Sequence, residues 1–110
     1  MIVIVFKYLI PKGYRGFTFY PFVFLKYPSD INDAVLLNHE KIHLRQQKEL
    51  LLVFFLLWYF LEFVFRFIQH QNINKAYHAL SFEKEAYQNE KDLMYLKGRK
   101  FGEFLNYFNT

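Results

Sequence analysis

The chain has 110 residues, of which 54% are hydrophobic, and it carries a formal net charge of +4. Length and apolar content predict one folded domain, residues 1–110, rather than a disordered chain. Acidic and basic residues alternate along the second half instead of forming a basic block, which argues against nucleic-acid binding, and the absence of cysteine leaves only histidine and carboxylate for any metal site.

The N-terminal region, residues 1–28, predicts a β-hairpin. Residues 2–10 and 16–27 are rich in Ile, Val, Phe and Tyr, and the PKGYRG segment between them carries turn-forming residues. Because Pro21 lies inside the second run, that strand is expected at an edge of the sheet or with a bulge. The opening MIVIVFKYLIP lacks the basic start and the cleavage site of a signal peptide, so no cleavable signal peptide is expected.

Residues 29–97 contain neither glycine nor proline, which predicts a helical region of about three helices. Ser29, Asp30 and Asn32 are suitable N-cap residues for a first helix from about residue 31. The polar run QHQNIN at 69–74 separates a second helix from a third, which is expected from about residue 74 to 97 with Gly98 as the residue that stops it. Residues 98–110 form a short aromatic tail. The predicted fold class is α+β, with a small N-terminal β-hairpin or sheet packed on about three helices.

The segment NHEKIHLRQQKE contains the pattern H-E-x-x-H at residues 39–43. Two histidines four apart project from the same face of a helix, so His39 and His43 can hold one ion. Glu40 lies about 100° further round, beside the ion, where it can hold a metal-bound water. Imidazole and carboxylate ligands suit zinc, and catalytic zinc sites keep three protein ligands. The alternative is a chance pattern whose histidines simply pack or face water.

A third ligand is needed, and the downstream segment FEKEAYQNE offers three glutamates. Glu83, Glu85 and Glu90 are the candidates. On a helix, Glu85 lies nearer the centre of the most apolar face than Glu83 does. Helical periodicity therefore slightly favours Glu85.

The segment HEKIHLRQQ followed by a distant glutamate resembles the gluzincins, which are zinc metallopeptidases with a downstream glutamate ligand. The likeness covers about half of the chain, and it is to integral-membrane families and to very short minimal gluzincins. The membrane families carry a later E-x-x-A-D motif. On this chain Glu83 and Ala86 fit that motif, while Tyr87 replaces the aspartate. A thermolysin-like E-A-x-x-D aligns Glu85 instead, with Asn89 at the acidic position.

This resemblance implies a metallopeptidase acting on a peptide or protein substrate. Glu40 would act as general base, and the implied zinc ligands are His39, His43 and Glu83, with Glu85 as the alternative. A further hydrogen-bond donor to the oxyanion would come from nearby side chains, for which the candidates are Tyr77, His78 and Tyr87. A strand at 17–25 would pair with the extended substrate.

Residues 50–68 form an apolar segment close to the roughly 20 residues that a bilayer-spanning helix needs. Its only charged residues are Glu62 and Arg66, which would be unfavourable in lipid. The segment either spans a membrane, lies on one, or is a buried central helix, so the expected location is membrane-associated or cytoplasmic. The competing functions are a non-enzymatic membrane-associated or partner-binding protein with a gluzincin-like scaffold, and a latent enzyme whose tail, Phe101 to Phe108, covers the cleft.

Overall fold

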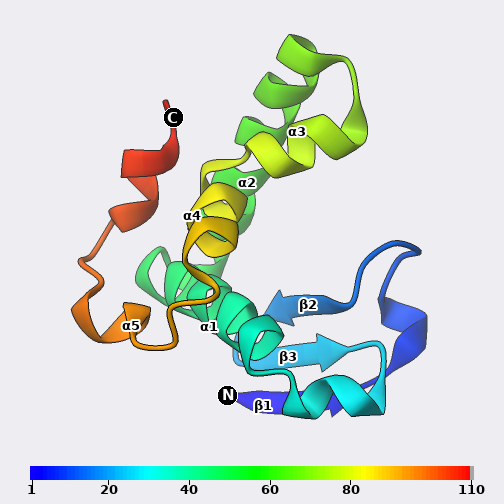
Figure 1. Ribbon diagram of the computed structural model, residues 1–110. Helices are drawn as coiled ribbons and strands as arrows, with labels where there is room; N and C mark the ends of the chain where they lie inside the picture. Colours follow the sequence, from blue (N-terminus) through cyan, green and yellow to red (C-terminus); the bar gives the residue numbers. More distant parts are fainter. Residues whose placement is uncertain (110) are drawn as a thin grey trace.

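The computed structural model describes residues 1–109 and shows a small N-terminal sheet followed by a helical region (Figure 1). The sheet contains β1 (Ile2–Val5), β2 (Gly16–Phe19) and β3 (Phe22–Leu25). The helices are α1 (Ala34–Glu49), α2 (Leu51–His70), α3 (Ile73–Ala79), α4 (Ser81–Asn89) and α5 (Tyr95–Gly98). The predicted α+β fold class is therefore confirmed.

The strands pair differently from the predicted hairpin. β3 lies in the centre of the sheet, parallel to β1 and antiparallel to β2. The hairpin is thus formed within the single run 16–27, which turns back between β2 and β3 at Tyr20 and Pro21. Pro21 occupies the turn, where its missing N–H removes no hydrogen bond from the ladder. The predictions of a hairpin between 2–10 and 16–27 and of a strand running through Pro21 were wrong.

Helix α1 begins three residues later than expected. Pro28–Asn32 form a 3-10 turn, and the side chain of Asp33 then accepts a hydrogen bond from the backbone N–H of Leu36 at 3.1 Å. This arrangement satisfies one of the backbone donors that a helix start leaves unpaired. At the other end, Leu51 has a φ of 53°, in the left-handed region that a leucine rarely adopts. This residue turns the chain from α1 into α2.

The predicted interruption at 69–74 is confirmed, because α2 ends at His70 and Asn72 caps α3. The single third helix expected from about 74 to 97 is wrong, since this stretch is divided into α3, α4 and α5. Helix α5 ends at Gly98, one residue beyond the predicted end at Lys97, so Gly98 is the last helical residue and not the left-handed residue that follows the helix.

The buried interior has two parts. One face of the sheet packs on α1, where Val23, Leu25 and Ile42 are fully buried. The second part is an aromatic cluster of Phe55 from α2, Phe82 from α4 and Phe104 from the 3-10 turn Glu103–Tyr107. Because Phe104 stacks on Phe82 with ring centroids 4.5 Å apart, the C-terminal segment belongs to the core.

Candidate metal centre

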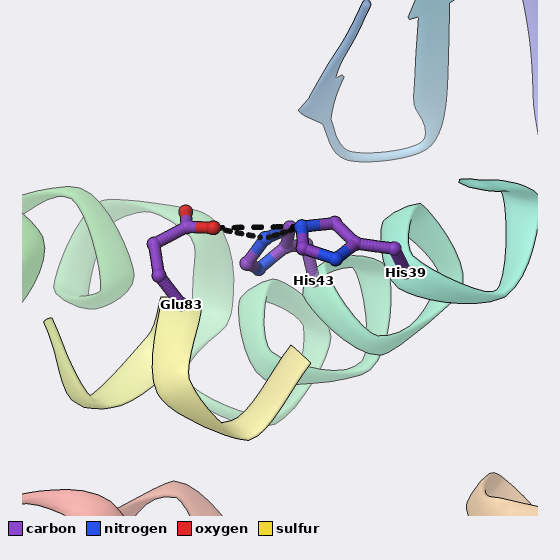
Figure 2. A group of neighbouring side chains, drawn as sticks. All are labelled: His39, His43 and Glu83. Atoms are coloured by element: carbon purple, nitrogen blue, oxygen red, sulfur yellow. Dashed lines mark hydrogen bonds and ion pairs between the residues drawn. The ribbon is translucent and has the colours of Figure 1, made fainter. Parts of the chain in front are cut away.

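Three side chains from two helices converge on one point. His39 and His43 lie one turn apart on α1, with their Nε2 atoms 3.2 Å from each other. Glu83 of α4 places Oε1 3.0 Å from Nε2 of His43 and 3.5 Å from Nε2 of His39 (Figure 2). All three side chains are buried, and their inward atoms lie within 4.8 Å of one another. This group is a candidate metal centre.

Of the three candidate glutamates, the structure brings Glu83 to the histidine pair. Glu85 points to another side of α4, where its carboxylate contacts the guanidinium of Arg99. Glu90 lies just beyond α4, with Oε1 2.9 Å from Nδ1 of His39, on the far side of that ring from the cluster. Periodicity favoured Glu85 because it lies nearer the centre of the apolar face, and Glu85 is indeed fully buried, but its charge is compensated by Arg99, 14 residues further along the chain.

Gln46 determines which nitrogen of His43 carries a proton. The Nε2 of Gln46 donates to the Phe82 carbonyl at 3.1 Å and to Oε1 of Glu85 at 2.9 Å. Its Oε1 therefore faces His43, whose Nδ1 lies 2.8 Å away and must be the donor. In the neutral ring Nε2 then keeps its lone pair, which is directed toward the cluster.

His39 is held in the same way by Glu90. The carboxylate of Glu90 can only accept when ionised, so Nδ1 of His39 donates and its Nε2 presents a lone pair. Both gluzincin motifs have an aspartate after the ligand glutamate, and this chain has Tyr87 or Asn89 at that position. Gln46 and Glu90 supply the missing imidazole partners.

The donor set fits a zinc ion. Bonds of 2.0–2.1 Å arranged tetrahedrally place ligand atoms about 3.3 Å apart. The three distances here are 3.0, 3.2 and 3.5 Å. In addition, three lone pairs directed at one point repel each other unless a proton or a cation lies between them. The residues present are therefore suited to zinc in both spacing and chemistry.

The electrostatics of the cluster also favour a cation. Burial disfavours the charged imidazole of His43, but the carboxylate of Glu83 outweighs burial and raises the pKa of His43 to about 9. Burial would raise the pKa of Glu83, yet His43 and His39 hold the pKa of this carboxyl well below its usual range. A site that retains a proton this firmly provides the negative potential that a divalent cation needs.

Glu40 lies beside the cluster and is not part of it. Its Oε1 accepts a hydrogen bond from the hydroxyl of Thr18 at 2.7 Å, and its Oε2 is 4.0 Å from Nε2 of His39. Gly16 gives this carboxylate space, since a Cβ at that position would lie 3.2 Å from Cδ of Glu40. Strand β2 thus positions Glu40 with Oε2 next to the histidine pair.

A cavity of about 320 Å³ opens beside these residues. Its polar walls include Glu40, His43 and Glu83, and Tyr77 from α3 also lines it. Among the other candidate donors, Tyr87 packs its ring 4.5 Å from that of His39, whereas His78 is exposed and contacts Tyr87. Tyr77 is therefore the candidate donor placed on the cavity wall.

The C-terminal tail, as far as residue 109, does not line this cavity. None of the described residues after Glu83 lines it, and Phe104 is instead buried in the aromatic core. Phe101 to Phe108 are therefore not the lid that the latent-enzyme hypothesis requires over this cavity. The aromatic character of the tail reflects its packing against α2 and α4.

Three residues of the site were not identified from the sequence: Thr18, Gln46 and Tyr59. The Tyr59 hydroxyl donates to Oε2 of Glu83 at 3.2 Å. Gln46 lies three residues after His43, a spacing that places the two side chains together on a helix and could have indicated the contact. Thr18 and Tyr59 have no such signal, because they reach the site only through the packing of β2 and α2.

No protein-family model matches the chain, and no curated protein or solved structure matches it. The resemblance to gluzincins therefore rests on the H-E-x-x-H pattern and a downstream glutamate.

Proposed function

We propose that the protein is a zinc-dependent metallopeptidase with Glu40 as general base and His39, His43 and Glu83 as ligands. The observation that carries this proposal is the convergence of three lone-pair atoms at zinc spacing, beside a positioned carboxylate and a cavity. A zinc ion bound there would polarise the scissile carbonyl and lower the pKa of a water to about 7.

In this proposal the protein's own side chains transfer the proton and orient the ligands. Glu40 takes a proton from the attacking water at Oε2 and later gives it to the leaving amine, while Thr18 holds Oε1. Gln46 and Glu90 keep both imidazoles turned with Nε2 inward. Tyr59 holds the second oxygen of Glu83, so that Oε1 remains directed at the histidines.

Strand β2 suits an extended peptide. It pairs with β3 on one side only, and Gly16, Phe17 and Thr18 lie along the cavity. Its open edge would bind a peptide through backbone hydrogen bonds, which place little demand on the substrate's sequence. On the cavity wall, burial and the charge of Glu83 raise the pKa of Tyr77, so its hydroxyl stays protonated and can donate to the oxyanion.

The decisive experiment measures zinc content and cleavage of a fluorogenic peptide library by the purified protein. Wild type should bind about one equivalent of zinc. Glu40→Gln should keep the zinc and lower cleavage by about 10²- to 10⁴-fold. Glu103→Gln, an identical change in the C-terminal segment, is the control and should alter neither quantity.

Two outcomes would contradict the proposal. Binding of less than about a tenth of an equivalent of zinc by wild type would exclude the metal site. Full zinc binding with no cleavage by wild type would favour the non-enzymatic alternative, in which the scaffold binds a membrane or a partner.

A further inference from the structure

Helix α2 is covered on one side only by the rest of the described chain. It is long and apolar enough to cross a membrane by length and composition, with a mean hydropathy of 2.1, and only 17% of that window is buried. The central helix of a soluble domain is apolar on most sides because other elements cover it. Here most apolar side chains of α2 remain exposed, so something outside the described chain must shield them from water.

The charged residues of α2 are turned toward the protein. Glu62 is 4% exposed and accepts hydrogen bonds from the backbone N–H and the hydroxyl of Ser81. Arg66 is 8% exposed, donates to the carbonyl of Phe108 and lies over the ring of that residue at 4.7 Å. Both charges thus have partners within the fold, which is how charged groups are accommodated in proteins that contact lipid.

The outward positions of α2 are apolar around more than half of its circumference, at about 100° per residue. They include Val53 at 74% exposure, Phe60 at 63% and Leu61 at 57%. A single partner helix needs only a stripe of about 100°. A helix that lies flat on a membrane keeps a charged face in water, whereas α2 exposes no lysine, arginine, aspartate or glutamate. The acyl chains of lipids can cover an apolar surface that extends around more than half of a helix, and they therefore fit α2 better than a single partner helix does.

The outer face of the sheet is apolar as well. The register places Phe22 beside Ile2 and Phe19, and Phe24 beside Ile4 and Phe17, so these six side chains share one face. The opposite face carries the buried residues that pack on α1. A sheet with one face in water normally alternates with polar residues on that face. This sheet has apolar residues on both faces.

The two apolar surfaces meet at the mouth of the cavity. Phe17 of the sheet and Leu56 of α2 both line the cavity, and they are 46% and 45% exposed. The exposed apolar surface therefore continues from the helix across the cavity mouth to the strands. An apolar environment that shields both α2 and the sheet from water would therefore lie beside the mouth of the cavity, next to the candidate metal centre.

We propose that α2 is embedded in the acyl-chain region of a lipid bilayer and that the outer face of the sheet lies on the same bilayer. The open edges of the sheet require water or headgroups as hydrogen-bond partners, so the strands stay at the interface while α2 enters the hydrocarbon. The cavity then opens at the membrane surface. This inference depends on exposed apolar surface alone and holds whether or not the metal centre is catalytic.

Vesicle flotation of the full chain tests the proposal. Detergent-purified protein is mixed with phosphatidylcholine vesicles, the detergent is removed, and the floating fraction is measured. Leu61→Lys introduces a charge on the outer arc of α2, and Leu93→Lys is a matched control because both leucines are 57% exposed. Wild type and the control should float, whereas the vesicle partition of Leu61→Lys should fall by at least about tenfold. Flotation of Leu61→Lys equal to wild type would overturn the proposal.

A second measurement uses the wild-type chain, so that it does not depend on the folding of a variant. Trp58 is the single tryptophan, and it lies on α2 with 37% exposure. Brominated lipids should quench its fluorescence, and aqueous iodide should quench it weakly once vesicles are present. Weak quenching by the lipids and strong quenching by iodide would overturn the proposal. A detergent-free protein that stays in solution as a dimer would also overturn it, since a second copy would then cover α2.

Discussion

Two glutamates of α4 are both buried and lie two residues apart, yet their surroundings differ in charge. Glu85 contacts the guanidinium of Arg99 and accepts a hydrogen bond from Tyr95. The described partners of Glu83 are two imidazoles and the hydroxyl of Tyr59, none of which carries a permanent positive charge. The two side chains point about 200° apart around the helix.

The difference shows how one helix can carry a structural carboxylate and a candidate metal ligand. A buried carboxylate needs a compensating positive charge. For Glu85 the chain supplies that charge through Arg99, so this glutamate has a structural role. For Glu83 the charge must come from a proton on His43 or from a bound cation. The predictions below test this division, from the largest expected effect to the smallest.

The largest effect is expected on metal binding. Glu83→Gln removes the anionic ligand, so zinc content should fall from about one equivalent to below about 0.1. Glu85→Gln makes the same change on the other side of α4 and should keep the zinc, because Arg99 retains its contact with Glu49 at 2.8 Å. Metal analysis of both variants after dialysis checks this. Equal zinc loss in the two variants would remove the distinction between them.

The stability of the fold should depend on the ion pair of Glu85 with Arg99 rather than on Glu83. The side chain of Arg99 has no exposed surface, and Arg99→Met would leave Glu85 and Glu49 without a cation. Unfolding should become easier by about 3–5 kcal/mol. Thermal unfolding measured by circular dichroism should show this, with partial recovery in the double variant Arg99→Met and Glu85→Gln. Arg15→Met is the control, because the side chain of Arg15 is half exposed and its loss should matter far less.

A smaller effect is expected from the residue that holds His39. Glu90→Ala removes the acceptor of Nδ1–H and should weaken zinc binding by about 10- to 100-fold. Competition with a zinc-binding dye gives the affinity. Lys91→Ala, a change at the exposed neighbouring residue, should leave it unchanged. An unchanged affinity in Glu90→Ala would show that the imidazole does not need this partner.

The smallest effect is a pH dependence of the metal-free protein. Because Glu83 raises the pKa of His43 from 6.5 to about 9, protonation stabilises the folded state. This stabilisation is fully present below pH 6.5 and is lost as the pH rises through 9. The melting temperature of chelated protein should therefore fall across this range, and the additional stability conferred by zinc should grow, since zinc displaces the proton. Glu83→Gln should flatten the slope, and an unchanged slope would assign it to other groups.

The local parts of the candidate site follow from helical periodicity. His39 and His43 meet because residues four apart share a face of any helix, and Glu40 lies beside them for the same reason. The helix itself is indicated by a stretch without glycine or proline and by suitable capping residues. These features depend on neighbours in sequence, so they can be read before any tertiary contact is known.

The choice of Glu83 depends on packing between segments far apart in the chain. Nothing within α4 indicates that Arg99 will neutralise Glu85. Nor does α4 indicate that Gln46 will donate to Glu85 and thereby turn its Oε1 toward His43. The same limit applies to the sheet, where a turn at Pro21 and a parallel pairing of β1 replaced the simpler hairpin. Each outcome depends on which distant surfaces meet, and periodicity contains no information on that.

The sequence by itself determined the α+β class, the histidine pair with its neighbouring glutamate, and an apolar segment after them. These depend on composition and on spacing within one helix. The tertiary structure alone decided that Glu83 faces the histidines and Glu85 faces Arg99, and that the charges of α2 point inward. The reason is that a buried charge is stabilised by the groups around it, which come from several elements and meet only when the chain has folded.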